Sequence, residues 1–367
     1  MGVRKKARKS RFWDVVACVV AVIAAVALLL ACLSQFLAPA RFPLLVYFGL
    51  YYIPLLTLNL LILLIALLRR KLRLFIPVVA LIPTLFLADR YVKIGREEAP
   101  LSGPGVSVLT YNIGRYGAGG RKVTQNESVS GIRQFLSEQD AAIVCLQEFA
   151  VKDTSALSAY LPAYPYSAHH LFKGNRAFGN VTLSKYPIVR TEVLTFPGSR
   201  NLSLVTDIDV NGQVLRVYNC HLESYSISFK TFVQKLFHKE TFTDEVERVH
   251  GRVREATIRR AEQVESLLRS EAASDVPCLV CGDFNDTPAS YTYRMLCKTK
   301  KDSFVESGTG FSSTYSLLWP MIRIDYILLP QEFASARHET ARIPWSDHYP
   351  VMTQIYFHPE HSEGSND

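Results

Sequence analysis

The chain has 367 residues, of which 49% are hydrophobic, and its formal net charge at pH 7 is +8. Residues 1–99 hold 14 Lys and Arg against 4 Asp and Glu, a net of +10, whereas residues 100–367 hold 27 against 29, a net of −2. The positive charge belongs to the N-terminal region. Residues 100–367, the larger part of the chain, therefore lack the overall basic charge of a non-specific nucleic-acid-binding protein.

Three apolar runs open the chain, at residues 12–37, 43–68 and 74–88. The first two exceed the roughly 20 residues that an α-helix needs to cross a bilayer. The third is shorter and contains two prolines; it would span if tilted or kinked, and a re-entrant segment is the alternative. Three membrane spans are therefore expected, and two remain the alternative. A cleaved signal peptide would explain the first run, but that run is long for a signal core and two more apolar runs follow it.

Basic residues flank these runs unevenly, and cytoplasmic loops collect Lys and Arg. Six basic residues precede the first run, four lie between the second and third, and only Arg41 lies between the first and second. Three spans then place the rest of the chain outside the cytoplasm, on the periplasmic side of the inner membrane in a bacterium. Two spans would place it in the cytoplasm. The lipid bilayer is the expected partner of this region, and no obligate protein partner is evident.

The domain organisation follows from these patterns. Residues 1–95 are expected to be a transmembrane region, 96–105 a linker with Pro100, Gly103 and Pro104, 106–358 one α/β domain, and 359–367 a disordered tail. Strands are expected at residues 106–111, 142–146, 180–183, 203–210, 214–219, 276–280, 324–329 and 351–357, with a turn at Asn211-Gly212. Helices are expected at residues 123–137 and 245–272. Many strands and few helices over roughly 260 residues are typical of packed sheets.

A stretch rich in Phe and Lys, residues 229–242, is interpreted as a surface helix or as a lid near a site.

Short polar clusters recur where the expected strands end. They are Thr110-Tyr111-Asn112, Gln147-Glu148, Asn219-Cys220-His221-Leu222-Glu223-Ser224, Gly282-Asp283-Phe284-Asn285-Asp286, Arg323-Ile324-Asp325-Tyr326 and Ser346-Asp347-His348. Each cluster alone is explained by a turn or a capping residue. Together they carry the carboxylates, amides and imidazoles that phosphate-ester chemistry needs.

The order of these clusters resembles the endonuclease/exonuclease/phosphatase (DNase I-like) superfamily over residues 106–357. The motifs Gln-Glu, Asn-x-His-Leu, Gly-Asp-Phe-Asn and Ser-Asp-His carry the resemblance, and the segment from Asn180 to Ile188, with its Ser-Lys-Tyr-Pro, is also similar. The resemblance implies a four-layered α/β sandwich behind a transmembrane helical region, in a membrane-anchored member of bacterial type. The expected site lies at the rim of two facing sheets.

The residue types fit metal-assisted hydrolysis of a phosphoester. A hard divalent cation bound to a phosphate oxygen lowers the pKa of water and offsets the charge of the ester. Mg²⁺ needs only one or two carboxylates and keeps several waters, and Mn²⁺ is a possible substitute. Glu148 is the leading ligand candidate with Asn112 beside it, and the resemblance places Asp347 close to the metal.

His348 is the candidate general base or, alternatively, a phosphate-bracing imidazolium. The resemblance makes Asp325 the carboxylate that orients it. Asp283 would orient or deprotonate the attacking water, and which of Asp283 and His348 takes the proton stays open. The remaining candidates are Asn285 for a phosphate oxygen or the water, His221 for a non-bridging oxygen, and Arg176 and Asn180 as weaker phosphate contacts.

The predicted function is a membrane-anchored, Mg²⁺-dependent phosphoesterase acting on a lipid headgroup or another small phosphoester. A tethered nuclease is the alternative, and a catalytically inactive binding or scaffold protein is a minor one. A local basic patch at Arg252, Arg254, Arg259 and Arg260 would serve a nuclease, but these residues are more simply the solvent-facing side of an amphipathic helix.

Overall fold

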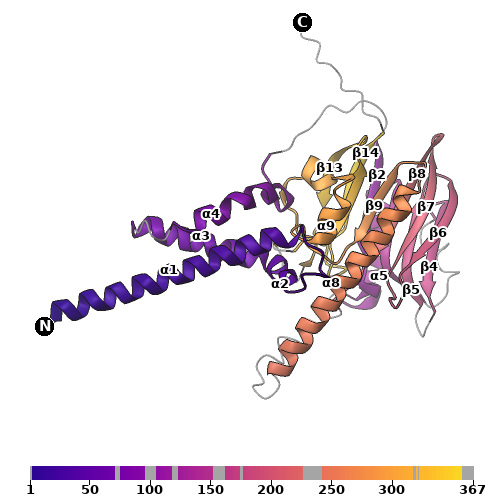
Figure 1. Ribbon diagram of the computed structural model, residues 1–367. Coiled ribbons are helices and arrows are strands. Elements are labelled where there is room, and N and C mark those ends of the chain that lie inside the picture. The colour runs from indigo at the N-terminus through magenta and orange to yellow at the C-terminus, as the bar shows by residue number, and fades with distance from the viewer. Residues whose placement is uncertain are drawn as a thin grey trace, which may run out of the picture. The chain divides into compact units, whose positions relative to one another are not determined.

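The computed structural model of the chain is shown in Figure 1. It describes residues 2–70, 75–95, 105–117, 123–151, 162–173, 177–225, 242–316, 320 and 322–357. Arg176, the segment 229–241 and the tail 359–367 lie outside the described residues. The chain forms two compact units, residues 1–89 with 287–294 and residues 90–286 with 295–367. The two units are described separately.

The N-terminal region is helical. It holds α1 (Gly2–Ser34), α2 (Leu45–Leu50), α3 (Tyr52–Leu68), α4 (Pro77–Leu81) and the 3-10 helix η2 (Ile82–Arg90). Of the described helices, α1 alone is long and apolar enough to cross a bilayer, through its stretch Phe12–Ser34. The second expected span is divided at Tyr51, which leaves α3 with 17 residues. The number of spans therefore stays a prediction.

Proline explains where these helices begin. A proline lacks the backbone N–H and fits the first turn of a helix, where that N–H would have no partner within the helix. Pro54 lies in the first turn of α3, and Pro77 opens α4. The second and third apolar runs therefore each contain a helix that begins at or near a proline.

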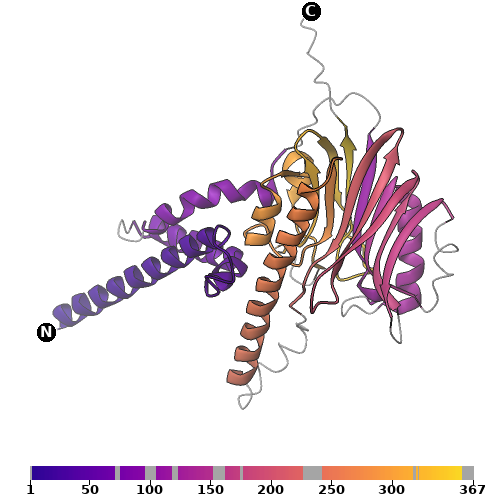
Figure 2. The ribbon, with the colours of Figure 1, turned by 45° about the vertical axis from the view of Figure 1, so that its right-hand side comes forward.

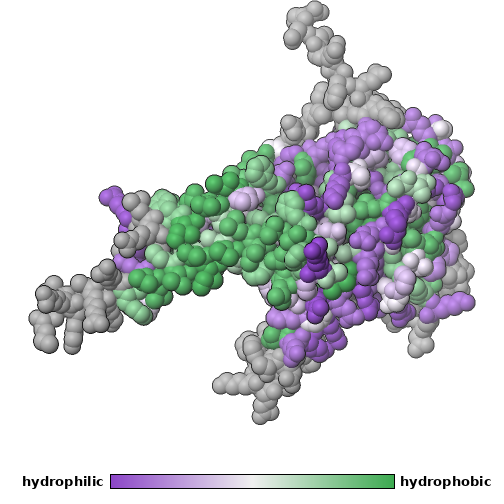
Figure 3. Space-filling model, in the orientation of Figure 1, coloured by the Kyte–Doolittle hydropathy of each residue, from purple (hydrophilic) through white to green (hydrophobic). Residues whose placement is uncertain are grey.

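Small residues line the contact between α1 and α3. Ala21 and Ala66 are fully buried there, and the Nδ2 of Asn59 on α3 donates to the carbonyl of Ala24 on α1 at 2.9 Å. Large apolar side chains face outward instead, as for Ile23 and Leu64, and Figure 3 shows them gathered over these helices. Small residues at the contact and large ones outside are typical of helices that pack in a membrane.

The second unit contains two six-stranded sheets. The first has the strand order β13-β14-β2-β3-β5-β4 and the second β10-β12-β9-β8-β7-β6. The strands of the first are β13 (Ala334–Thr340), β14 (Val351–Tyr356), β2 (Val106–Asn112), β3 (Ile143–Val151), β5 (Ala177–Ser184) and β4 (Tyr166–Phe172). Those of the second are β10 (Lys300–Asp302), β12 (Asp325–Pro330), β9 (Cys278–Asp283), β8 (Gln213–His221), β7 (Leu202–Val210) and β6 (Ile188–Thr195). A short ladder pairs β1 (Val92–Lys93) with β11 (Gly310–Phe311).

Two long helices cover the outer faces of the sheets, α5 (Gln125–Gln139) on the first and α8 (Phe242–Ala272) on the second (Figure 2). The smaller helical elements of this unit are η3 (Gly114–Tyr116) and α10 (Ser303–Ser307). Another short helix, α9 (Tyr291–Leu296), belongs mostly to the first unit. A core that includes Val108, Cys145, Val217 and Ile327 fills the space between the sheets. The expected four-layered α/β sandwich is confirmed.

The strands that the sequence did not predict are the edges of the two large sheets, β4, β6, β10 and β13, and the two short strands β1 and β11. An inner strand is buried on both faces and reads as an apolar run, whereas an edge strand such as β6 is mostly exposed and carries polar residues. The expected turn at Asn211-Gly212 is confirmed, because both residues have positive φ in a two-residue hairpin between β7 and β8.

Gly282 lies on β9 opposite Cys220 of β8, where the two backbones leave no room for a Cβ. Its φ is +130°, and a Cβ added there would lie 2.0 Å from the carbonyl oxygen of Cys220. Any larger residue must therefore push apart two central strands, both of which end in candidate site residues.

We predict that Gly282→Ala lowers the free energy of unfolding by about 3 kcal/mol or more, since backbone strain and a steric clash act together. Urea denaturation of the purified protein measures this. Gly212→Ala is the matched control: φ there is +91° with nothing within 4 Å of the added Cβ, so only about 1 kcal/mol is expected. Equal costs for the two variants would contradict the close approach of β8 and β9.

Candidate active site

The polar clusters meet at one end of the sandwich because of how the strands pair. β2 and β3 are parallel, and Asn112 lies opposite Gln147. β8 and β9 are parallel, and His221 lies opposite Asp283. β12 runs antiparallel to β9, so that its first residue, Asp325, also lies opposite Asp283. The carboxyl ends of four strands and the first residue of a fifth thus meet at one rim.

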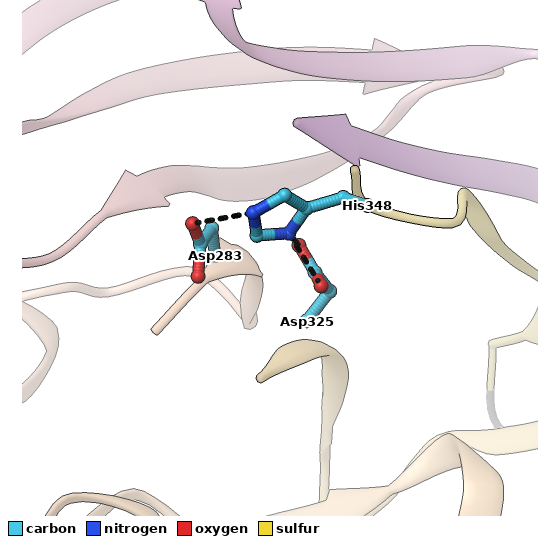
Figure 4. A group of neighbouring side chains, drawn as sticks. All are labelled: Asp283, Asp325 and His348. Atoms are coloured by element: carbon cyan, nitrogen blue, oxygen red, sulfur yellow. Dashed lines mark hydrogen bonds and ion pairs between the residues drawn. The ribbon is translucent and has the colours of Figure 1, made fainter. Parts of the chain in front are cut away.

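A buried triad of His348, Asp325 and Asp283 lies at the centre of this rim (Figure 4). His348 Nδ1 contacts both carboxylate oxygens of Asp325, at 3.1 and 3.0 Å. On the other side of the ring, Nε2 lies 3.8 Å from Asp283 Oδ2. The Asp325 contact orients the imidazole so that Nε2 faces Asp283.

The charges of the triad are set by burial and by one another. Burial lowers the pKa of His348, but the carboxylates of Asp325 and Asp283 outweigh burial and hold this pKa well above 6.5. Burial raises the pKa of Asp325 to about 6, with His348 opposing and Asp283 adding to the rise. At neutral pH the ring is therefore an imidazolium paired with a carboxylate.

Asp283 is held in place by two amides. Its Oδ2 accepts from the Nδ2 of Asn112 at 2.8 Å and from the Nδ2 of Asn285 at 3.2 Å, and its Oδ1 accepts from the backbone N–H of Asn285 at 2.8 Å. Asn285 has a φ of +52°, a strained conformation for a non-glycine residue. The turn after β9 is therefore bent so that Asn285 folds back onto the carboxylate.

His221 points into the same space with a free nitrogen. Its Nε2 is buried and has no hydrogen-bond partner among the described residues. The nearest acceptors are Glu148 Oε1 at 3.7 Å and Asp283 Oδ2 at 3.9 Å. A buried donor or acceptor without a partner is costly. At these distances one ligand atom beside His221 can contact Nε2 and one of the two carboxylates at the same time.

Glu148 lies at a bulge in β3, where the pairing with β5 shifts between Leu146 and Phe149. Its φ is +51°, and its carboxylate pairs with Arg115 at 3.1 Å. The bulge and the positive φ break the strand's alternation and turn this side chain toward the rim. At 24% exposure, Glu148 is more accessible than Asp283 or Asp325.

The donor set fits a hard divalent cation. Asp283, Asp325 and His348 each offer a ligand atom, and these atoms lie within 4.8 Å of one another. His348 and Asp325 already satisfy each other, however, which leaves the oxygens of Glu148 and Asn112 as the more available donors. Asn112 Oδ1 accepts one backbone N–H, from Gly114 at 3.0 Å, and keeps a second lone pair. Oxygen donors are those that Mg²⁺ prefers.

Asp347 lies beside the same turn. A Cβ added at Gly114 would come within 3.0 Å of Asp347 Oδ1. The hydroxyl of Ser346 donates to the carbonyl of Asn112 at 2.8 Å and so ties the segment 346–348 to the end of β2. The structure therefore places Asp347 near Asn112, and its role beside a metal stays a prediction.

Asn180 is buried between the sheets. Its Nδ2 donates to the carbonyl of Asn219 at 2.9 Å, and Asn219 Oδ1 accepts from Gln147 Nε2 at 2.8 Å. Gln147 and Asn219 stood in the sequence motifs without an assigned role, and the structure makes them a bridge between the two sheets beneath the rim. Only contacts between elements far apart in sequence reveal that bridge.

The expectation that Arg260 faces solvent is wrong. Arg260 is fully buried. Its Nη1 donates to the carbonyl of Glu223 at 2.6 Å, and its Nε lies 3.3 Å from Asp286 Oδ2. It ties the segment after His221 to the turn after Asp283, which an exposed side chain could not do. Arg252 and Arg254 are exposed, as expected.

A model of the Endonuclease/Exonuclease/phosphatase family matches residues 109–348, more than half of the chain, and a model of a domain of unknown function matches residues 14–91. None of the curated proteins matches this chain in sequence.

Solved structures share the fold. The endonuclease/exonuclease/phosphatase from Bacteroides vulgatus is 17% identical, with a TM-score of 0.53 over 70% of this chain and 100% of that one. Its counterpart from Beutenbergia cavernae is 17% identical, with a TM-score of 0.51 over 70% and 72%. A mannosyl-6-phosphatase from Bacteroides thetaiotaomicron is 16% identical, with a TM-score of 0.50 over 69% and 100%.

We predict that Asp325→Asn lowers the pKa of His348, because the variant loses the carboxylate that does most to raise this pKa against the effect of burial. The folded-state pKa of His348 lies above 6.5. Protonated His348 therefore stabilises the fold fully below pH 6.5. This stabilisation declines as the pH rises through the folded-state pKa of His348, and Asp325→Asn should lack the decline. NMR titration of the metal-free protein measures the pKa. An exposed carboxylate, Asp275→Asn, is the control, and a pKa unchanged by Asp325→Asn would contradict the coupling.

Proposed function

The chain belongs to the endonuclease/exonuclease/phosphatase family, and from that membership we propose that it is a membrane-anchored, divalent-metal-dependent phosphoesterase. The observation that carries the proposal is the convergence of two imidazoles on the Asp283 carboxylate, at 3.8 Å from His348 and 3.9 Å from His221. At these distances a phosphate oxygen or a water molecule beside each pair can contact the ring nitrogen and the carboxylate at the same time.

The metal would be held by Glu148, with Asn112 and Asp347 as the further oxygen donors. When bound, Mg²⁺ or Mn²⁺ supplies a Lewis acid for a phosphate oxygen and lowers the pKa of a water. The unpaired lone pair of Asn112 and the exposure of Glu148 support this assignment.

The raised pKa of His348 favours its phosphate-bracing role over its role as a general base. An imidazolium carries its proton at neutral pH and donates it from Nε2, toward the space beside Asp283. His221 Nε2, which has no partner among the described residues, would donate to a second phosphate oxygen as charge builds up in the transition state. Asp283 is then left to orient the attacking water and accept its proton, while Asn285 holds Asp283 in place.

A lipid headgroup or another small phosphoester remains the favoured substrate class. Residues 100–367 carry a net charge of −2, which does not provide the long-range attraction that nucleic-acid binding relies on. The apolar helix Phe12–Ser34 supports a membrane tether, and a tethered site meets headgroups at high local concentration. Nuclease activity is the alternative that a substrate screen would reveal.

We predict that the full-length protein hydrolyses bis(p-nitrophenyl) phosphate, that EDTA stops the reaction and that Mg²⁺ or Mn²⁺ restores it. Asp283→Ala and His348→Ala should each lower kcat by roughly 10²–10⁴-fold. Asp275→Ala, an exposed carboxylate, should leave kcat unchanged, and thermal unfolding should show that the variants are folded. Turnover that persists in chelator, or at the wild-type rate in either site variant, would refute the assignment.

We further predict that the protein expressed in bacterial cells stays in the membrane after carbonate washing. Protease added to spheroplasts should digest the unit that follows residue 89, as three spans require, while a cytoplasmic reporter stays intact. Full protection of that unit would instead indicate two spans and a cytoplasmic site.

A further inference from the structure

Two arginines lie over one aromatic ring beside the candidate site. The guanidinium carbon of Arg115 is 3.9 Å from the centroid of the Phe178 ring, and that of Arg200 is 4.8 Å from the same centroid. Arg200 also lies 5.8 Å from the centroid of Phe172. The arginines come from separate segments, Arg115 from η3 after β2 and Arg200 from the turn before β7, so the fold and not a local sequence pattern brings them together.

The pairing of β4 with β5 places this cluster next to the catalytic rim. Phe178 and Asn180 are two residues apart on β5 and so lie on the same face of the sheet, about 7 Å from one another along the strand. Phe172 lies opposite Phe178 and His170 opposite Asn180. Asn180 donates to the carbonyl of Asn219 between the sheets, so the face that carries the Phe178 ring is the face that carries the site.

The segment that carries Arg115 adopts an unusual conformation. Gly114, Arg115 and Tyr116 have φ values of +54°, +53° and +61°. Such a run is unfavourable for residues with a Cβ and persists where surrounding structure enforces it, most often at functional sites. Here it lets Asn112 face Asp283 while Arg115 reaches both Glu148 and Phe178.

The charges of the cluster do not balance. Glu148 pairs with Arg115, and no ion pair of Arg200 is found within the part of the chain that the structure describes. Two cations near one ring repel each other, and the ring's quadrupole compensates them only in part. Arg115 is 54% exposed and Arg200 is exposed. Arg115 contacts Glu148 through Nε, so its two Nη groups and the guanidinium of Arg200 are the groups left to bind an anion. Guanidinium N–H groups suit phosphate, which they bind in bidentate fashion.

We propose that Arg115 and Arg200, stacked over Phe178, form a subsite that binds a second phosphate group of the substrate next to the scissile phosphoester. The proposal rests on the proposed function and narrows it, from any phosphoester to one that carries a further phosphate. Glu148 links the two sites, because its carboxylate contacts Arg115 on one side and faces His221 on the other.

The test compares substrates that differ by one phosphate only. Thymidine 5′-(p-nitrophenyl phosphate) and its 3′-phosphorylated form share a scissile bond and a leaving group. The full-length protein in detergent, with Mg²⁺, should show a kcat/KM at least about tenfold higher for the second substrate, mainly through KM. Glycerophosphoinositol and its 4-phosphate provide a second matched pair, which distinguishes a headgroup source of the phosphate from a nucleotide source.

Arg200→Gln removes the charge and keeps most of the side-chain length. It should bring the ratio of the two kcat/KM values close to one, and Arg200→Lys should give an intermediate ratio because the charge stays and the planar fork is lost. Arg190→Gln is the matched control, an exposed arginine on β6 that pairs with Glu192, and it should keep the wild-type ratio. A wild-type ratio near one for both pairs, or a ratio that Arg200→Gln leaves unchanged, would overturn the subsite.

A binding measurement tests the subsite independently of whether the protein is a phosphoesterase. If the wild-type protein turns over neither substrate, the phosphoesterase proposal fails. The affinities for thymidine 3′,5′-bisphosphate and thymidine 5′-phosphate, measured by calorimetry, still test the subsite. The bisphosphate should bind at least about tenfold more tightly to the wild type and lose that advantage in Arg200→Gln. Equal affinities in the wild type would reject the subsite without any reference to catalysis.

Discussion

The carboxylate of Asp283 accepts hydrogen bonds from amides of both sheets while two imidazoles face it at longer range. Asn112 at the end of β2 donates to it across the space between the sheets, and Asn285 donates to it from the following turn. A carboxylate with 1% exposure is stable there only because these N–H groups replace water. Any displacement of one sheet against the other would break these hydrogen bonds, so the geometry of the candidate site depends on how the two sheets are packed.

Strand pairing decides which side chains reach that carboxylate. The parallel pair β8–β9 sets His221 beside Asp283, and the antiparallel partner β12 sets Asp325 on the other side. The close backbone approach at Gly282 and the bulge that exposes Glu148 are local departures from regular strands. Both occur at the rim, where regular alternation would have turned side chains away from the site. The regular inner strands therefore form the rigid part of the sheets, and their irregular ends carry the candidate site residues.

The inner strands and the motifs at their ends were predictable because burial on both faces leaves an apolar run with a polar end. The edge strands β4 and β6 were not, since a partly solvated strand leaves no such pattern. The burial of Arg260 was equally hidden, because a helical pattern cannot reveal that the segment after His221 folds over α8. The stacking of Arg115 and Arg200 on Phe178 brings together segments far apart in sequence, and no single segment carries a signal for it.

Local charge and bulk charge act at different distances in this protein. The net charge of −2 on residues 100–367 governs attraction over distances longer than the screening length, which is about 8 Å at physiological salt. Two guanidinium groups near one ring act well within that length, after a substrate has arrived. A polyanion that relies on long-range electrostatic attraction would gain little from this surface. A small phosphoester that arrives by diffusion along a membrane would need only the local contact with the two guanidinium groups. The distribution of charge thus supports the proposal of a compact substrate with closely spaced phosphates, which would be bound by local contacts and not attracted from a distance.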